Sequence, residues 1–585
     1  MAVENLITEH IDIWTSAVIT KSTSGRGSSK KLELYGIKKL RELILELAVR
    51  GKLVPQDPND EPASVLLEKI AQEQTQLIKD QKIKKLKKLP NISKDELLFD
   101  LPNGWQWCRV GNLFNTIQSG GTPSKREPSY WEGNIPWASV KDLGKSLVLT
   151  DTQDHISEEG LIAGSKLANK GDLLICTRMG LGKIAIVSTP MAFNQDLKAV
   201  SLTKYVHTDF FLNSYRTIKI KGTGTTVAGI SQDQLLNYVF SLPPLQEQHR
   251  IVAKVDELMA LCDQLEQQTE ASIEAHQVLV TTLLDTLTNS ANADELMQNW
   301  ARISEHFDTL FTTEESIDQL KQTILQLAVM GKLVPQDPSD EPAAELLKRI
   351  AEEKAQLVKE KKIKKEKVLP PISEDEKPFT LPSGWEWCRV GSISNLKGGF
   401  AFKSKDFVTN SIYQVIRMGN IRPDNLRLSE SPAYIPQQIA EEAKDYKLVS
   451  GDILLTMTGT KGKRDYLYSL LINEKDIVSN QLFLNQRLCN IQPIFVAPSF
   501  VNMVIKADIV LDAIFTKSTG TANQANIGMD AIKNWVLPVA PLAEQHRIND
   551  MVNELMDVCD HIKTRLVDLQ ATQLKLTDTI IEQAV

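Results

Sequence analysis

Apolar residues recur every three or four positions over two long stretches of the chain, which is the spacing of an amphipathic helix. In the first stretch the apolar stripe runs from Ile251 to Leu287 and is surrounded by Glu, Gln and Lys. The stripe predicts one helix from Gln246 to about Asn289, which at 1.5 Å per residue would be roughly 65 Å long. A similar stripe begins at Ile548 and predicts a long C-terminal helix.

Each stripe needs a partner, because an apolar face flanked by polar residues is stable only when another element covers it. The obvious partners are helices predicted at Tyr35 to Val49 and at Ile317 to Val329, each of which runs into the phrase GKLVPQ, whose Gly and Pro end a helix. We therefore expect a helical coiled-coil frame; packing of each helix on its own domain is the alternative. The helices that follow are expected to use Asp60 and Asp340 as N-caps.

The frame occurs twice. Residues 40–113 match 320–393 without a gap at an offset of 280, and residues 243–266 match 540–563 at an offset of 297. The growth of the offset means that the segments between the repeats differ by 17 residues. A period of this length indicates duplicated domains rather than a solenoid.

The segments between the repeats change to the pattern of strands. Both contain a Gly-Asp turn followed by an apolar strand, KGDLLICTRMGLGK at 170–183 and SGDILLTMTGTKGK at 450–463. Each strand leads into a loop rich in Gly, Thr, Lys and Arg. The predicted fold class is therefore α/β, with two divergent α/β inserts separated by long helices.

These patterns divide the chain, whose length of 585 residues allows about four domains, into six regions. They are an N-terminal extension with a Ser/Gly-rich linker at Ser22 to Lys31 (1–31), a first helical region (32–100), a first insert (101–245), a central helical spacer (246–380), a second insert (381–542) and a C-terminal helix (543–585).

Small polar and basic residues gather in the loops of both inserts, beside aromatic residues such as Trp131 and Trp137. Such loops present backbone N–H groups and cations to phosphates and base edges. Surface hairpins and a buried aromatic core are the alternatives. The candidate nucleic-acid contacts are Ser119, Thr122, Lys125, Arg126, Lys141, Arg178, Lys183 and Thr225 in the first insert and Lys397, Lys403, Arg417, Arg422, Lys461, Lys463, Arg464 and Lys517 in the second.

Charge is divided between the frame and the inserts. The whole chain has a net charge of −7, but residues 101–245 hold 14 Lys and Arg against 11 Asp and Glu, and residues 381–542 hold 17 against 14. The inserts are therefore mildly basic and the frame is acidic. The sign favours nucleic acid, although ordinary surface variation also produces an excess of this size.

Motifs for catalysis are missing. A phosphate-binding GxxxxGK[ST] loop needs a glycine five positions before its Gly-Lys pair, and those positions are Thr177 and Met457. The chain has no GxGxxG and no Asn/Asp-Pro-Pro-Tyr/Phe tetrapeptide of the kind that positions a flipped adenine for methylation. His249 and His546 lie on amphipathic helices and are predicted to be structural. We predict no catalytic residue and no metal site.

Nothing in the sequence predicts a membrane or secreted protein. No apolar run reaches the roughly 18 residues of a membrane helix, and the start MAVENLITEHIDIW is too acidic for a signal peptide. The six cysteines form no CxxC pair and are predicted to be small buried hydrophobic residues. We expect a cytoplasmic protein.

Taken together, the repeated phrases resemble a known family, the specificity subunits of type I restriction-modification systems. The resemblance covers essentially the whole chain. It rests on LAVRGKLVPQ and LAVMGKLVPQ, on the LPxGWxWxxxG openings at Leu101 and Leu381, on QSGGTPSKREPSYWEGNIPWASVKDL, on KGDLL and SGDILL, and on PLQEQHRIV and PLAEQHRI.

The resemblance implies that each insert is a target recognition domain that reads one half of a bipartite, asymmetric double-stranded DNA target. The helices would form an antiparallel coiled-coil spacer with pseudo-twofold symmetry and dock two methyltransferase subunits, through which restriction subunits join. S-adenosylmethionine, ATP and Mg²⁺ would belong to those partners, which methylate adenine at N6 and cleave DNA, and no cofactor to this chain. A coiled-coil scaffold for proteins and a self-contained nuclease or methyltransferase are the alternatives.

Overall fold

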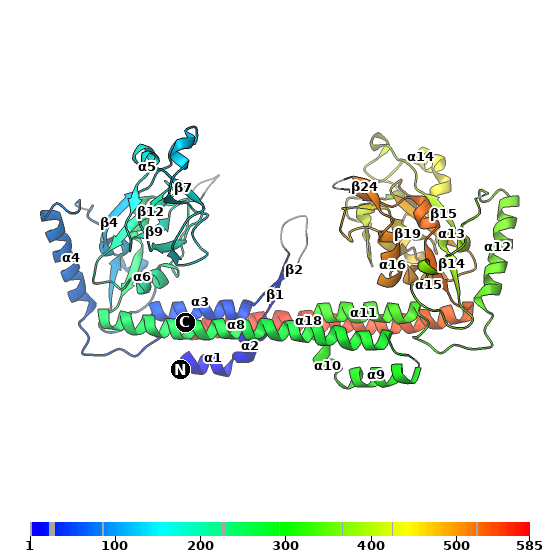
Figure 1. The fold of residues 1–585 in the computed structure, drawn as a ribbon, viewed down its shortest axis with the longest axis horizontal. Helices are drawn as coiled ribbons and strands as arrows, with labels where there is room; N and C mark the ends of the chain where they lie inside the picture. Colours follow the sequence, from blue (N-terminus) through cyan, green and yellow to red (C-terminus); the bar gives the residue numbers. More distant parts are fainter. Residues whose placement is uncertain are drawn as a thin grey trace. The chain divides into compact units, whose positions relative to one another are not determined.

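The computed structural model describes residues 3–22, 30–84, 87–223, 228–291, 293–365, 367–423, 425–521 and 524–585. It separates into two compact units (Figure 1). One unit consists of residues 1–272 with 569–585, and the other of residues 273–568. Each unit therefore contains one copy of the repeated frame and one insert.

The long helices of the frame lie where the apolar stripes predict them. α3 spans Tyr35–Val49, α8 spans Leu245–Thr288, α11 spans Glu314–Val329 and α18 spans Leu542–Ala584. α8 is 44 residues long. The predicted helices at 35–49, 246–289 and 317–329 are thus confirmed to within three residues.

In the first unit, α3 packs between segments of the two longest helices. Arg41 of α3 forms an ion pair with Glu266 of α8 at 2.6 Å, and the Val49 carbonyl at the other end of α3 accepts a hydrogen bond from Ser241, just before α8 begins. Tyr35, at the start of α3, donates to Asp578 of α18 at 2.8 Å, and Arg50, just after α3, donates to the carbonyl of Val585. α3 is therefore antiparallel to α8 and parallel to α18.

In the second unit, α11 makes the equivalent contacts with the other parts of the same helices. Gln277 of α8 donates to Glu315, near the start of α11, at 2.7 Å, and Lys332, just after α11, donates to the carbonyl of Thr288 at the end of α8 at 2.8 Å. The part of α8 that belongs to this unit therefore runs parallel to α11. Lys563 of α18 pairs with Asp318 of α11 at 2.7 Å, and Asp560 pairs with Lys321. Within each unit α8 and α18 run antiparallel, as the coiled-coil prediction requires.

The helices after GKLVPQ start differently from the prediction. α4 (Ala63–Lys79) and α12 (Ala343–Lys359) have prolines at the N-cap, with no side-chain cap. The predicted caps are wrong because Asp60 and Asp340 instead accept from Arg250 and Arg547, each at 2.6 Å. The first N–H of each helix donates to a glycine carbonyl of the insert at 2.8 Å.

Shorter elements precede α3 and α11 in their units. The first unit has α1 (Val3–Glu9), α2 (Ile11–Ser16) and the antiparallel pair β1 (Ile19–Ser22) and β2 (Lys30–Glu33), and the second has α9 (Ala293–Glu305) and α10 (Phe307–Leu310). Trp14 is fully buried, and a Cβ at Gly36 would lie 2.3 Å from its carbonyl oxygen, so glycine is needed there. The predicted linker at 22–31 is therefore partly strand, and residues 23–29 lie outside the described residues.

The first insert is a mixed α/β domain built on two sheets. Its sheets have the orders β4-β12-β9-β10-β6 and β7-β5-β11-β8, and a separate pair joins β13 to β3. The strands are β3 (Gln106–Arg109), β4 (Phe114–Ser119), β5 (Ile135–Ala138), β6 (Val148–Leu149), β7 (Asp154–Ile156), β8 (Leu167–Ala168), β9 (Leu173–Cys176), β10 (Ile184–Val187), β11 (Met191–Phe193), β12 (Leu197–Leu202) and β13 (Val239–Leu242), and the helices are α5 (Glu158–Gly164), α6 (Thr208–Tyr215) and α7 (Gln232–Asn237).

The second insert has a related but not identical arrangement. Its sheets have the orders β15-β23-β19-β21, β20-β25-β24, β16-β22, β14-β26 and β17-β18. The strands are β14 (Glu386–Arg389), β15 (Ser394–Gly398), β16 (Tyr413–Ile416), β17 (Ile421–Arg422), β18 (Asn425–Leu426), β19 (Ile453–Thr456), β20 (Thr458–Gly459), β21 (Ser469–Leu471), β22 (Gln481–Leu484), β23 (Leu488–Pro493), β24 (Thr519–Thr521), β25 (Gln524–Asn526) and β26 (Val536–Val539), and the helices are α13 (Val390–Ile393), α14 (Gln437–Glu442), α15 (Pro498–Val504), α16 (Asp508–Phe515) and α17 (Met529–Lys533).

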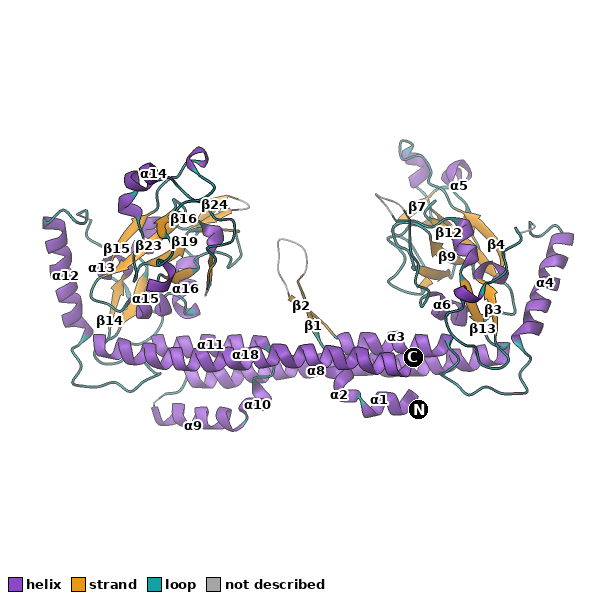
Figure 2. Ribbon diagram, turned by 180° about the vertical axis from the view of Figure 1, so that it is seen from behind, coloured by secondary structure: helices purple, strands orange, loops and turns teal. Residues whose placement is uncertain are grey.

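Strands and helices are divided between the inserts and the frame. Apart from the pair β1–β2, the strands lie in the inserts, and the frame of each unit is helical (Figure 2). The six cysteines are all free and buried, as predicted, and burial raises the pKa of the Cys262 thiol to about 11. None of the described helices combines the length and the hydropathy that a membrane span requires.

Candidate nucleic-acid interface

A buried glutamate holds each insert on its frame. Glu247, in the first turn of α8, accepts from the indole N–H of Trp105 at 3.0 Å and from the Gln56 amide at 3.1 Å. In the second unit Glu544 accepts from Trp385 at 3.1 Å. Burial raises the pKa of both Glu247 and Glu544, because their surroundings disfavour the charged form.

The glutamine that follows each glutamate binds the insert directly. Gln248 is fully buried; its carbonyl accepts from the His207 amide at 2.7 Å, just before α6, and its amide donates to the Pro243 carbonyl at 3.0 Å. Gln545 makes the same two bonds, to Ala497 before α15 and to Ala540. The repeated phrase PLxEQHRI is thus a set of contacts between frame and insert.

A third repeated contact joins the opening strand of each insert to the segment before it. Arg109 bonds to Glu96 and to the Asn237 carbonyl, and Arg389 bonds to Glu376 and to the Asn534 carbonyl. The hydrogen bond from the arginine lowers the pKa of Glu96 to about 2, and that of Glu376 likewise to about 2. The frame contacts are the same in both copies.

Three segments meet at the end of β9 in the first insert. The Thr177 N–H donates to the Asp196 carbonyl at 2.9 Å, and the Thr177 carbonyl accepts from Ile230 at 2.9 Å. Met179 donates to Ala228 at 3.2 Å. The loop after β9, the turn between β11 and β12 and the segment before α7 therefore form one surface.

Four of the eight predicted contacts of the first insert lie around this surface. Arg178 is exposed and pairs with Gly229 in an isolated β-bridge. Lys183 donates to the Val140 carbonyl at 3.3 Å, which places its loop beside the one that carries exposed Lys141. The Thr122 hydroxyl donates to Gln195, in the turn next to Asp196.

The other predicted residues of the first insert are less closely joined to it. Ser119 accepts from Lys198 across β4 and β12. Lys125 lies 5.8 Å from the ring centroid of Trp131, whose ring packs edge-on against Trp137, and Arg126 is exposed beside it. Thr225 lies outside the described residues.

The second insert has the same junction at the end of β19. The Met457 N–H donates to the Arg487 carbonyl at 3.3 Å, and the Met457 carbonyl accepts from Ile527 at 2.9 Å. Thr458 pairs with Asn526 across β20 and β25. These bonds match those of Thr177 in the first insert, so the two junctions correspond position by position.

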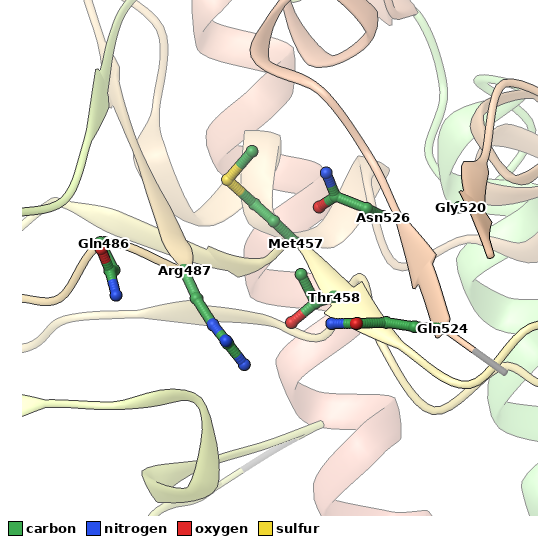
Figure 3. Close-up of a pocket in the computed structure, with 7 residues that line it drawn as sticks. All are labelled: Met457, Thr458, Gln486, Arg487, Gly520, Gln524 and Asn526. Atoms are coloured by element: carbon green, nitrogen blue, oxygen red, sulfur yellow. The ribbon is translucent and has the colours of Figure 1, made fainter.

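A pocket of about 520 Å³ opens at this junction (Figure 3). Its lining is polar apart from one methionine and one glycine, and it contains no carboxylate among the lining residues. Arg487, Gln486 and Gln524 are exposed, whereas Met457 and Thr458 are half-buried. The lining residues are Met457, Thr458, Gln486, Arg487, Gly520, Gln524 and Asn526.

Some predicted contacts of the second insert lie near this pocket. Lys461 and Lys463 follow β20, and Lys517 precedes β24, which are strands of the three-stranded sheet at the pocket. Thr458 donates to the Met418 sulfur at 2.8 Å, so the turn that begins at Arg417 and leads into β17, which ends at Arg422, is adjacent.

Several of these cations already have protein partners. Arg464 forms ion pairs with Asp508 at 2.8 Å and with Asp512, and lies 5.4 Å from the ring centroid of Phe515. Arg422 is 3.8 Å from a carboxylate oxygen of Glu430. Two of the predicted cations bind main-chain carbonyls: Arg417 donates to Ser431, and Lys397 donates to Asp445 at 2.6 Å. Lys403 is exposed.

Arg487 and the two glutamines beside the junctions were not predicted from the sequence. A signal for them exists, because FNQDL at 193–197 and LNQRL at 484–488 share three of five residues. It escapes a search at the frame offsets of 280 and 297, because its own offset is 291. No group of His, Cys, Asp and Glu suited to a metal ion occurs among the described residues.

Comparison with known proteins places these features in a family. Residues 102–275 and 382–570 match the type I restriction modification DNA specificity domain. The specificity subunit of the type I restriction enzyme EcoAI of Escherichia coli is 43% identical over 617 residues, and that of EcoEI, also of Escherichia coli, is 41% identical over 604 residues; both alignments cover 100% of each chain.

A solved structure of the HsdS subunit from Thermoanaerobacter tengcongensis is 16% identical, with a TM-score of 0.39, and the match covers 83% of this chain and 98% of that one. The family match covers more than half of this chain, and the relatives from Escherichia coli align over its full length. The chain therefore belongs to the family of type I restriction-modification specificity subunits, the non-catalytic subunits that recognise the DNA target.

Proposed function

We propose that this chain reads a bipartite, asymmetric double-stranded DNA target, with residues 101–245 reading one half-site and residues 381–542 the other. The observation that carries the proposal is the contrast between the two copies. The frame contacts repeat, with Trp105–Glu247 at 3.0 Å and Trp385–Glu544 at 3.1 Å, whereas the residues at the loop junctions differ. Equal supports with unequal reading surfaces suit a target whose halves differ.

The repeated frame suits two copies of one partner. We propose that each copy docks one methyltransferase subunit and that restriction subunits join through the methyltransferases. S-adenosylmethionine, ATP and Mg²⁺ belong to those partners, which methylate adenine at N6 and cleave DNA, and this chain holds none of them. The complex would work in the cytoplasm. Family membership favours this role over a protein-binding scaffold or a self-contained enzyme.

DNA contacts are proposed where cations and hydroxyls gather at the junctions. Exposed cations without a recorded protein partner are free to replace counterions on phosphates. Among the predicted contacts that the structure describes, this holds for the side chains of Arg126, Lys141, Arg178, Lys403, Lys461 and Lys517. The other candidates stay predictions: Ser119, Thr122, Lys125, Lys183, Thr225, Lys397, Arg417, Arg422, Lys463 and Arg464. Arg464 is the weakest of them, because Asp508 and Asp512 bind its guanidinium.

The test is to produce the chain together with its methyltransferase subunit in a host without other adenine methylation. The purified complex is weighed, and the host genome is mapped for N6-methyladenine. We expect two methyltransferase subunits per chain and a split, asymmetric methylated motif that disappears when this chain is omitted. A continuous motif, or one that persists without the chain, would contradict the proposal.

A further inference from the structure

The matching hydrogen bonds show which residues of the two inserts occupy the same place. Arg487 corresponds to Asp196, because their carbonyls accept from Met457 and Thr177. Thr458 corresponds to Arg178, because each comes directly after the residue that makes these bonds. Thr458 pairs with Asn526, and Arg178 pairs with Gly229.

An arginine is present at this place in both inserts, but a different segment supplies it. In the first insert the arginine is the residue at the strand exit, Arg178, and the turn residue is Asp196. In the second insert the strand exit carries Thr458, and the turn carries Arg487. Both arginines are exposed, and neither guanidinium has a recorded hydrogen bond or ion pair to a described residue, whereas Asp196 is 9% exposed.

The surroundings of Arg487 are those of a group that recognises an uncharged polar edge. Figure 3 shows its guanidinium and the ends of Thr458 and Gln524 directed into the same space, and Gln486 and Asn526 also line the pocket. The amides and the hydroxyl offer both donors and acceptors, and no carboxylate in the lining competes for the arginine. The planar fork of a guanidinium matches O6 and N7 of guanine.

We infer that Arg487 is a specificity-determining residue that reads a guanine in the half-site of the second insert, and that Arg178 reads a guanine in the half-site of the first. The inference rests on the proposed function and deepens it. Gln195 and Gln486 are the same residue at matching positions, so they cannot distinguish the half-sites. The arginines can, because each enters from a different segment.

The experiment uses the complete complex with its methyltransferase subunits and maps N6-methyladenine for wild type, Arg487→Ala and Arg487→Lys. Lysine keeps the charge but not the bidentate fork, so it separates base reading from a phosphate contact. Lys475→Ala is the matched control, because Lys475 is an exposed cation of the same insert away from the pocket. It lies three residues after Ile472, whose N–H donates to the carbonyl of Asp452, and Asp452 is at the opposite end of β19 from Met457.

We expect both Arg487 variants to slow methylation of the wild-type site about 10- to 100-fold and to relax one guanine position in one half-site. The other half-site and the Lys475→Ala variant should be unchanged. A uniform loss in Arg487→Ala that Arg487→Lys restores, with the motif intact, would identify a phosphate contact and overturn the inference. Changes in both half-sites, or in neither, would also overturn it.

Failure of the inference and failure of the proposed function are distinguishable. A wild-type complex that methylates a split motif, together with unaltered Arg487 variants, refutes only the role of Arg487. A wild-type complex that gives no split motif refutes the proposed function and the inference with it. A half-site of the second insert that contains no G·C pair overturns the inference alone.

Discussion

Two kinds of contact occur in both copies of the duplicated chain: those that attach each insert to its frame, called frame junctions here, and those that join the loops within each insert. They differ in how far their side chains have diverged between the copies. At the frame junctions, the Arg250–Asp60 and Arg547–Asp340 distances are both 2.6 Å, and the buried glutamate and glutamine bonds recur. At the loop junctions, where the loops meet at the ends of β9 and β19, the main-chain hydrogen bonds recur but the side chains differ. Asp196 of the first insert is replaced by Arg487 at the matching position of the second, and Arg178 is replaced by Thr458.

The difference separates the contacts that attach each insert to its frame from a surface whose side chains vary between the two copies. Main-chain bonds at the loop junction depend on the fold and tolerate any side chain, whereas the frame bonds use particular side chains. A frame that presents the same groups twice can bind the same partner twice. A loop junction with a fixed backbone and free side chains can change its target without changing its support.

The largest expected effect is at the buried glutamates. Glu247→Ala leaves the indole N–H of Trp105 without its acceptor, and we expect β3 to lose about 2–3 kcal/mol of local stability. Glu247→Gln should lose less, because its single amide oxygen can still accept from Trp105, only the bond from Gln56 is lost, and burial already disfavours the charge. Hydrogen exchange of the β3 amides measures this.

Glu544→Ala and Glu544→Gln, followed at β14, are the matched variants in the second unit. The two copies should agree, because their contacts have the same geometry. A large loss in one copy and none in the other would break the equivalence of the two frames.

A smaller effect is expected from comparing a free arginine with a bound one. Arg178→Ala should slow methylation of the wild-type site about 10-fold and relax one half-site. Arg464→Ala should leave the motif unchanged, because Asp508 and Asp512 already bind its guanidinium.

Lys170→Ala controls for charge in the first insert, since Lys170 is exposed at the other end of β9. Kinetics of methylation on a short duplex measure all three variants. A relaxed motif in Arg464→Ala and an unchanged one in Arg178→Ala would reverse their roles.

The smallest effect is expected from acid. The Arg109 hydrogen bond lowers the pKa of Glu96 from 4.5 to about 2, so the stability it contributes is present above pH 4.5 and is lost as the pH falls toward 2. Glu96→Gln should be less stable than wild type at pH 7, and the gap should close in acid. The effect is small because the Glu96 side chain is 34% exposed.

Thermal unfolding from pH 7 to pH 2 measures the gap, and Glu376→Gln should behave alike. A gap that is constant with pH would show that the carboxylate charge at this contact does not stabilise the folded chain.

Most of the frame could be predicted from the sequence, because helical periodicity and repetition report on it directly. The helix predicted from Gln246 to about Asn289 is observed at Leu245–Thr288. The N-caps were mispredicted, since a local preference of Asp60 for a helix start is outweighed by its long-range bond to Arg250. Such a bond has no local signal.

The reading surface could be predicted only in part. Arg178 and Lys463 follow an apolar strand and are visible as strand-end cations. Arg487 lies in a short turn between β22 and β23, and its position becomes meaningful only when the Met457 N–H is seen to bond to its carbonyl. Composition also could not show that Arg464 is bound by aspartates 44 and 48 residues away.

The most direct test of the central claim replaces residues 381–542 with a second copy of residues 101–245 and maps N6-methyladenine made by the complex with the methyltransferase subunits. If equal frames support interchangeable readers, the half-site of the first insert should appear twice in the methylated motif and the half-site of the second should vanish. A complex that still methylates the wild-type motif, or that assembles and methylates nothing, would contradict the account.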